Sequence, residues 1–234
     1  MILCIETATS LCSVALCDRD GIAGLKENAE GRSHASLLTV FIDELLNKKG
    51  IGTQDLDAVA VSKGPGSYTG LRIGVSVAKG IAYASSIPLI GIDTTLSMFR
   101  GFLPVAKEKY GISADDLFCP VLDARRMEVY YSVYSSNGNQ VKKTSAEIID
   151  GNSFKEYPES SVIYIFGEGA VKCKEVIKRK NIIVDEEFRI SASFMHGPVY
   201  ESFNKSHFED VAYFEPFYLK DFLTTQPVKN ILGK

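Results

Sequence analysis

The start of the chain alternates short apolar runs with polar turns. Apolar residues gather at Ile2–Ile5, Cys12–Cys17 and Ile22–Lys26, and the turn Asp18–Gly21 separates the last two runs. Runs of this length, bounded by turn residues, are typical of β-strands. The pattern therefore predicts three strands joined as an antiparallel meander.

Helical spacing follows the meander. Apolar residues recur three and four positions apart between residues 37 and 46, a period typical of a helix with a buried face, with Ser33 as its expected N-cap. A second helix is predicted over Tyr68–Ser85. Short apolar runs at AVAVSKG (58–64) and IPLIGID (87–93) predict buried strands that alternate with these helices. The expected order is three strands followed by αβαβ, which is an α/β arrangement.

The pattern changes beyond about Phe102. Aromatic residues enrich the segment 117–134, and Asn137-Gly138 is a typical hairpin turn. The segment SVIYIFGEGAVKCKEVIKRK (161–180) predicts a strand, a Gly-Glu-Gly turn and a helix. Two domains are therefore expected, residues 1–101 and residues 102–234.

Charge and composition narrow the function classes. The chain has 26 Lys and Arg against 29 Asp and Glu, so it lacks the positive field with which a stand-alone nucleic-acid binder attracts phosphates. Its five cysteines form no C-x-x-C pair, and MILCIETATS lacks the basic region of a secretion signal, so a reducing, cytoplasmic location is expected. The apolar runs are far shorter than the roughly 18 residues of a membrane span, which predicts a soluble protein.

The segment Ser62–Gly74, SKGPGSYTGLRIG, carries four glycines and a proline just before the second helix. Glycines here can let backbone N–H groups approach a phosphate, or can simply form a tight turn. A P-loop is excluded, because Leu71 and Arg72 stand where that motif needs Lys and Ser or Thr. Gly66, Ser67 and Arg72 are candidates for nucleotide contact, with a turn as the alternative.

Further polar candidates lie at turns between predicted strands. Glu6, Thr7 and Ser10 follow the first strand, where a carboxylate with hydroxyls can bind a divalent cation or a phosphate, or can complete its own turn. Asp123 and Arg125 lie at a later turn, where a guanidinium can hold a carboxylate or phosphate. The alternative for that turn is a surface salt-bridge cluster.

The second helix carries a stripe of small residues beside an apolar ridge. Gly70, Gly74 and Ala78 recur at intervals of four, so another helix, or the helix's own sheet, could approach closely. The apolar positions between residues 37 and 46 cover about 240° of their helix, wider than one core face requires. We expect a partner subunit to cover the remaining surface of both helices. The predicted interface residues are Leu37, Phe41, Leu45, Gly70, Ile73, Gly74, Val77, Ala78 and Ile81.

Several segments occur in an order that resembles one family. They are IETAT, SHASLLTVFIDELL, GPGSYTGLRIG, LDARRMEVYYSVY, GEGA and EPFYLK, and the glycine segment from Gly64 to Gly74 is the most specific of them. They resemble the TsaB (YeaZ) family of tRNA threonylcarbamoyladenosine biosynthesis proteins, formerly grouped with glycoprotease (M22 peptidase) homologues. The resemblance implies the two-lobed actin/Hsp70/sugar-kinase (ASKHA, RNase H-like) fold, with a mixed sheet and flanking helices in each lobe.

The resemblance implies a partner protein rather than an enzyme. Thr94 and Met98 stand where the related catalytic protein TsaD has two metal-binding histidines, and a hydroxyl with a thioether offers a hard metal little. Neither a metal site nor a catalytic residue is therefore expected. The implied role is a non-catalytic scaffold for TsaD in forming N6-threonylcarbamoyladenosine at position 37 of tRNAs that read ANN codons.

The resemblance also implies where cofactors and partners belong. ATP or ADP and a divalent metal are expected on TsaD, and no cofactor on the isolated chain. The ATPase TsaE is expected to join the assembly, tRNA to bind only through the complex, and the free chain to form a homodimer. A small-molecule kinase or ATPase of the same fold is the alternative. A peptidase is disfavoured, because His34, His196 and His207 form no H-x-x-x-H or H-E-x-x-H motif.

Overall fold

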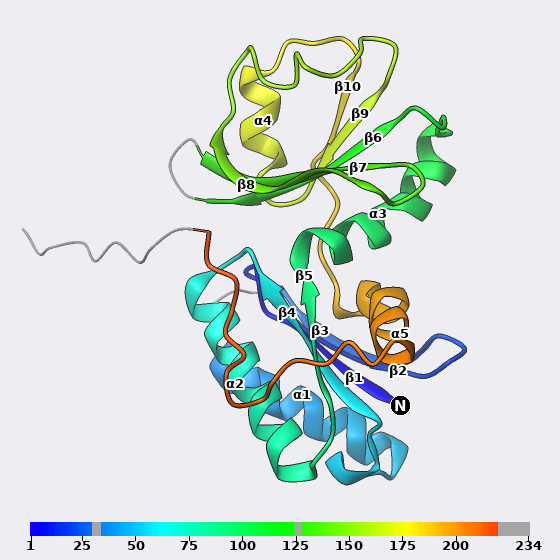
Figure 1. The fold of residues 1–234 in the computed structure, drawn as a ribbon, viewed down its shortest axis with the longest axis vertical. Coiled ribbons are helices and arrows are strands. Elements are labelled where there is room, and N and C mark those ends of the chain that lie inside the picture. Colours follow the sequence, from blue (N-terminus) through cyan, green and yellow to red (C-terminus); the bar gives the residue numbers. More distant parts are fainter. Residues whose placement is uncertain (30–33, 125–127, 220–234) are drawn as a thin grey trace, which may run out of the picture.

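The chain folds into two lobes stacked end to end, each built on its own five-stranded sheet (Figure 1). The computed structural model describes residues 1–29, 34–124 and 128–219. The elements of the first lobe are β1 (Ile2–Glu6), β2 (Cys12–Cys17), β3 (Ile22–Asn28), α1 (His34–Lys49), the short helix η1 (Thr53–Asp55), β4 (Ala58–Gly64), α2 (Tyr68–Ser85) and β5 (Leu89–Asp93). The strand order is β3-β2-β1-β4-β5, with the first three strands antiparallel and β4 and β5 parallel to β1.

The second lobe repeats this topology. After the connecting helix α3 (Thr94–Tyr110) come β6 (Leu117–Asp123), β7 (Glu128–Ser135), β8 (Gln140–Ile148), β9 (Ile163–Phe166), α4 (Ala170–Val176) and β10 (Ile182–Asp185). The strand order is β10-β9-β6-β7-β8, again an antiparallel meander followed by two parallel strands. The prediction of a mixed sheet with flanking helices in each lobe is confirmed.

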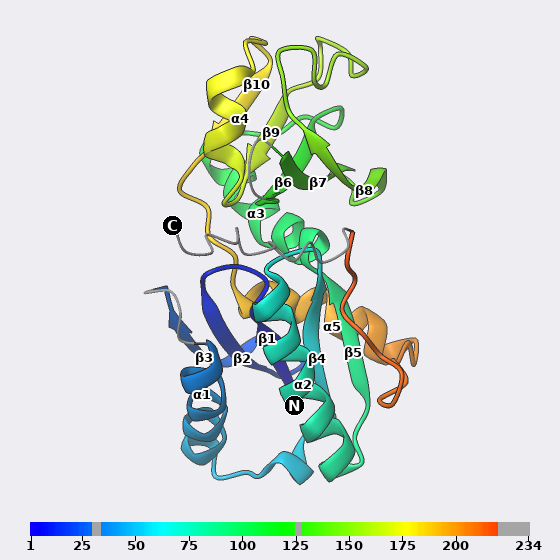
Figure 2. The same ribbon diagram turned by 90° about the vertical axis from the view of Figure 1, so that its left-hand side faces the viewer.

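Helices cover both faces of the first sheet. Figures 1 and 2 show α1 and α2 running side by side on one face, where a core of large aliphatic side chains separates them from the strands. The opposite face is covered by the short helix η2 (Ala192–Met195) and α5 (His196–Asn204), which pack on small residues of β1, β2 and β4. The sheet is therefore the buried middle layer of the lobe.

Local sequence signals placed the first-lobe elements well. The helix predicted over Tyr68–Ser85 has those bounds. Its N-cap is Ser67, whose hydroxyl accepts a hydrogen bond from the Gly70 amide. The strand Cys12–Cys17 is also as predicted. Ser33, the expected N-cap of α1, lies outside the described residues.

The lobes divide differently from the expected split after residue 101. That point falls inside α3, which packs on strands of both sheets. Residues 192–217 were expected in the second lobe but return to the first, where η2 and α5 complete its core and the following strap runs along the edge strand β5. The physical reason is that this face of the first sheet is apolar, and α1 and α2, the long helices described within residues 2–93, both pack on the opposite face.

None of the helices in the described part of the chain is long and apolar enough to cross a membrane.

Candidate docking surface and interlobe turns

Five of the nine predicted interface residues are half-buried apolar side chains on α1 and α2. We call these five residues the α1–α2 ridge. They are Leu37, Phe41, Ile73, Val77 and Ile81, each packed at the edge of the first lobe's core. Val40 on the outer side of α1 is 44% exposed. Figure 2 looks onto this side of the two helices. Apolar side chains that are only half covered favour contact with a further partner.

The other predicted interface residues belong to the interior. Leu45, Gly70, Gly74 and Ala78 are all buried within the first lobe. A Cβ atom on Gly74 would lie 2.2 Å from the Thr7 hydroxyl oxygen, and one on Gly70 would lie 2.1 Å from the Thr7 carbonyl oxygen. The stripe of small residues therefore lets α2 approach its own sheet, and its assignment to a partner interface was wrong.

The glycine segment between β4 and α2 packs closely against the turn that follows β1. A Cβ atom on Gly66 would lie 2.4 Å from the Ala8 carbonyl oxygen, and the Ser67 amide donates to that same oxygen over 2.6 Å. The Gly70 amide donates to the Ser67 hydroxyl over 3.2 Å. Amides that already have internal acceptors are not arranged as a phosphate cradle. This geometry favours the turn over the nucleotide loop.

Glu6 lies at the end of β1 and is fully buried. Its Oε1 accepts hydrogen bonds from the Ala8 amide (2.6 Å) and the Ser62 hydroxyl (2.8 Å), whereas Oε2 has no partner among the described residues. Burial raises the pKa of the Glu6 carboxyl to about 7, although these hydrogen bonds oppose the shift. Thr7 beside it is also buried, and its hydroxyl has no described partner. The carboxyl thus titrates near neutral pH in the interior.

A direct contact between the lobes forms at Ser10. Its hydroxyl donates to Glu168 Oε1 over 2.9 Å and its amide to the same oxygen over 3.4 Å. Glu168 lies in the Gly-Glu-Gly turn after β9, and Gly167, with φ of +109°, leaves no room for a side chain beside the Val121 carbonyl. Sequence reasoning noted this turn but did not connect it with Ser10, since contacts over 158 residues leave no local signal.

The other described candidates for a cleft site, Arg72 and Asp123, lie on different elements. The Arg72 guanidinium lies over the Tyr68 ring, 4.8 Å from its centroid, on the exposed side of α2. Asp123 at the end of β6 accepts a hydrogen bond from Lys172 of α4 within the second lobe. Arg125 lies outside the described residues. The structure brings together Glu6, Thr7, Gly66 and Ser67, but neither Arg72 nor Asp123 joins them.

The positions compared with metal-binding histidines lie in the interior between the lobes. Thr94 opens α3 and Met98 follows one turn later; both are buried, and the Met98 methyl group packs next to Gly167. Among the described residues, no three His, Cys, Asp or Glu side chains are grouped so as to hold a metal ion. His34 and His196 instead hydrogen-bond backbone carbonyls, those of Leu11 and Asp18.

Comparison with known proteins relates most of the chain to one family. The model for tRNA N6-adenosine threonylcarbamoyltransferase, TsaD, matches residues 24–225. The chain is 35% identical over 140 residues to the tRNA threonylcarbamoyladenosine biosynthesis protein TsaB of Escherichia coli, an alignment that covers 60% of this chain and 57% of that protein. It is 32% identical over 133 residues to TsaB of Bacillus subtilis, with 57% and 54% covered. The chain thus spans little more than half the length of these curated relatives.

Solved structures agree on the fold over nearly the full length. A Pseudomonas aeruginosa protein described as similar to the peptidase YeaZ superposes with a TM-score of 0.80 at 21% identity, covering 94% of this chain and 99% of that one. YeaZ from Pseudomonas aeruginosa superposes with a TM-score of 0.76 at the same identity, with 93% and 99% covered. The resemblance seen in the sequence motifs is therefore confirmed, and the chain belongs to the TsaD threonylcarbamoyltransferase family, within which it is of the TsaB (YeaZ) kind.

Proposed function

We propose that this chain is a non-catalytic partner of a TsaD threonylcarbamoyltransferase in the formation of N6-threonylcarbamoyladenosine at position 37 of tRNAs that read ANN codons. The observation that carries the proposal is the α1–α2 ridge, whose five apolar side chains stay half covered in the isolated chain. The pathway is proposed from the curated relatives, which are named tRNA threonylcarbamoyladenosine biosynthesis protein TsaB. The ridge would dock on TsaD, and the chemistry would take place on that partner.

The buried turns support a scaffold more than a kinase or ATPase. The Ser67 amide is hydrogen-bonded to the Ala8 carbonyl, and Thr94 and Met98 offer no pair of metal ligands. ATP or ADP and a divalent metal would therefore bind on TsaD. We propose that the ATPase TsaE joins the same assembly in the cytoplasm.

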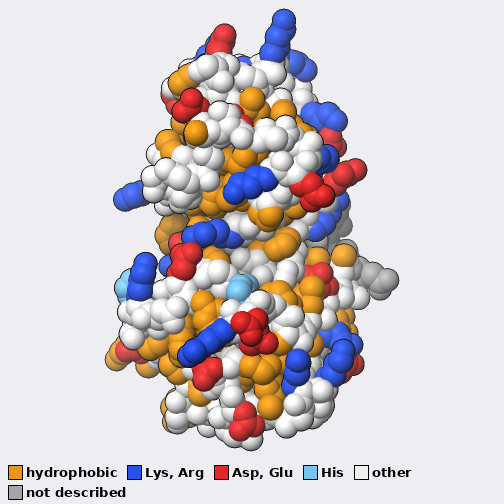
Figure 3. Space-filling model, turned by 90° about the vertical axis from the view of Figure 1, so that its right-hand side faces the viewer, with side chains coloured by type: hydrophobic (Ala, Val, Ile, Leu, Met, Phe, Trp, Pro, Cys, Tyr) orange, Lys and Arg blue, Asp and Glu red, His pale blue; other side chains and the backbone are white. Residues whose placement is uncertain are grey.

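Charge supports contact with tRNA only through the complex. The net charge of the chain is −3, and on the face drawn in Figure 3 basic and acidic side chains are interspersed over both lobes. Binding of a nucleic-acid backbone needs a run of positive charge without intervening carboxylates.

The test is the affinity for TsaD of the same organism, measured by calorimetry with the full chain. Phe41→Asp places a charge in the ridge and should weaken binding by at least about 2 kcal/mol, the loss typical of a central interface residue. Tyr83→Ser is the matched control, because Tyr83 is an aromatic residue of α2 that is 81% exposed and lies off the ridge. Circular dichroism checks that both variants are folded.

Two results would contradict the proposal. Equal affinity of Phe41→Asp and the wild type for TsaD would exclude the ridge as the docking surface. Tight magnesium-dependent ATP binding by the isolated chain, lost in Gly66→Val, would favour the kinase or ATPase alternative instead.

A further inference from the structure

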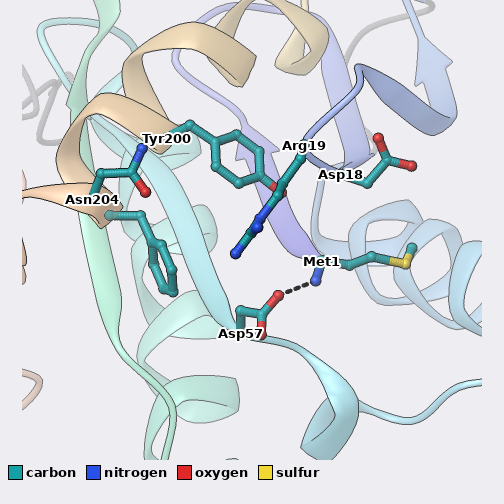
Figure 4. Close-up of a pocket in the computed structure, with 7 residues that line it drawn as sticks. Met1, Asp18, Arg19, Asp57, Tyr200 and Asn204 are labelled. Carbon is teal, nitrogen blue, oxygen red and sulfur yellow. Dashed lines mark hydrogen bonds and ion pairs between the residues drawn. The ribbon is translucent and has the colours of Figure 1, made fainter.

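A small cavity lies at the opposite end of β1 from Glu6, on the side of the first sheet covered by α5. Its volume is about 220 Å³. The start of β1, the turn between β2 and β3, the residue before β4 and the last two turns of α5 form its walls (Figure 4). None of the residues of the α1–α2 ridge contributes to it. A ligand there would serve a function separate from the proposed docking on TsaD.

The wall formed by α5 is held in place by hydrogen bonds to the end of β2. The Tyr200 hydroxyl donates to the Cys17 carbonyl oxygen over 3.2 Å, and His196 Nε2 lies 2.9 Å from the Asp18 carbonyl oxygen. Phe203 packs against the core that α5 shares with the sheet. Two aromatic side chains, those of Tyr200 and Phe203, therefore border a cavity whose shape exists before any ligand binds.

Among the described residues that line the cavity, the acidic side chains have partners and the Arg19 guanidinium does not. The Asp57 carboxylate forms an ion pair with the Met1 ammonium group. Asp18 Oδ1 accepts the amides of Asp20 and Gly21 within its own turn, and Figure 4 shows this carboxylate directed away from the other side chains. In the part of the chain that the structure describes, Arg19 has neither a hydrogen bond nor an ion pair, and its side chain extends between Tyr200 and Asp57 in Figure 4.

We infer that this cavity binds a small organic anion, with a carboxylate or phosphate group on an apolar or aromatic body. A guanidinium presents paired N–H donors that match the two oxygens of a carboxylate or phosphate. The rings of Tyr200 and Phe203 offer an apolar surface to the body of the ligand, and the Asn204 amide adds a polar group at the rim. The volume lies below the range of about 300–1,000 Å³ typical of drug-sized ligands, so the ligand is expected to be small.

The experiment titrates the full chain with small probes and follows backbone amide shifts by NMR. Benzoate and phenyl phosphate combine an anion with a ring and should give saturable shifts at Arg19 and along α5, with a dissociation constant of about 1 mM for so few atoms. Inorganic phosphate is an anion without a ring, and benzyl alcohol is a ring without an anionic group. Both should bind at least about tenfold more weakly than benzoate.

Two variants test whether Arg19 is the cation that binds the anionic group of the ligand. Arg19→Gln should weaken benzoate binding at least about tenfold, because it removes a charge-assisted contact. Lys180→Gln is the matched control, since it removes one exposed positive charge in the second lobe and should leave the affinity unchanged. Arg19 is exposed, and an unchanged amide spectrum away from the cavity will confirm that the variant is folded.

Three outcomes would overturn the inference. Shifts that do not saturate, or that cluster outside the cavity, would exclude this site. Equal affinity of Arg19→Gln and Lys180→Gln for benzoate would exclude the guanidinium as its anchor. Inorganic phosphate that binds as tightly as benzoate would exclude the ring-bordered cavity as a site for an organic body.

Discussion

Two glycines of α2, Gly74 and Gly80, have different surroundings, so the same substitution should have opposite effects at the two positions. On α2, a Cβ atom at Gly74 would lie 2.2 Å from the Thr7 hydroxyl oxygen, whereas one at Gly80 would meet nothing within 4 Å. We expect Gly74→Ala to lower the free energy of unfolding by about 1–3 kcal/mol through overpacking. Gly80→Ala should raise it by about 0.5–1 kcal/mol, because glycine is unfavourable in a helix interior. Urea denaturation of both variants measures the two effects.

The comparison tests whether close packing is what requires a glycine at position 74. If Gly74→Ala is as stable as Gly80→Ala, the close approach of α2 to the turn after β1 is not a real constraint on the sequence. The larger change Gly74→Leu should be still less stable, since its side chain would have to displace Thr7 and Val61.

Glu6 should make the stability of the protein depend on pH. Its carboxyl pKa rises from an ordinary 4.5 to about 7 in the folded chain, so the folded state binds more protons than the unfolded state between these values. The contribution of Glu6 to the free energy of unfolding is fully present below pH 4.5 and is lost as the pH rises through 7. A shift of this size corresponds to a loss of about 3 kcal/mol. Chemical denaturation from pH 5 to pH 8 measures it.

Glu6→Gln supplies the control for this pH dependence. Glutamine keeps an oxygen for the Ala8 amide and the Ser62 hydroxyl but does not ionise. The variant should therefore be more stable than the wild type at pH 8, and the two should converge near pH 5. A wild-type pH slope that persists unchanged in Glu6→Gln would assign the effect to other groups.

At the scale of elements, local sequence patterns were sufficient to predict where α2 lies along the chain. They were not sufficient to predict which face of the helix packs on the sheet. The bounds of α2 followed from helical spacing and from the glycine-rich segment before it, both of which are local. Which side of α2 meets the sheet was not predictable, because a stripe of small residues suits a helix packing on strands as well as a helix packing on another helix. The structure buries that stripe and leaves Ile73 and Val77 half covered.

The strap that follows α5, residues 205–217, gives a prediction for a single segment. Lys79 of α2 donates to the carbonyl oxygens of Ala212 (3.1 Å) and Phe214 (2.9 Å), and the Glu209 amide donates to the carbonyl of Leu89 on the edge strand β5. Lys79→Met should loosen the strap, because hydrogen bonds that involve a charged group contribute about 1.5–3 kcal/mol. Amide hydrogen exchange over residues 209–217 should accelerate.

The matched control for the strap is Lys107→Met, at an exposed lysine of α3. It should leave exchange over residues 209–217 unchanged. Equal protection of the strap in Lys79→Met and the wild type would show that the edge contacts with β5 hold it without the lysine.

At the scale of the whole molecule, the two lobes could be predicted from the sequence, but the contacts that join them could not. Each meander is local, and its turns were recognisable. The return of residues 192–217 to the first lobe and the hydrogen bonds between Ser10 and Glu168 link segments far apart in the chain. Such contacts depend on the complete fold, and the burial that moves the Glu6 pKa depends on it too.

The free chain should associate with itself through the α1–α2 ridge. An isolated chain that leaves Phe41, Val77 and their neighbours half covered gains from any contact that removes their apolar surface from water. We expect a dimer by light scattering at high micromolar concentration, a monomer for Phe41→Asp, and an unchanged dimer for Tyr83→Ser. Addition of TsaD should dissociate the dimer, because the two partners would compete for one surface. A wild-type chain that stays monomeric but binds TsaD, or a dimer that binds TsaD without dissociating, would contradict a shared surface.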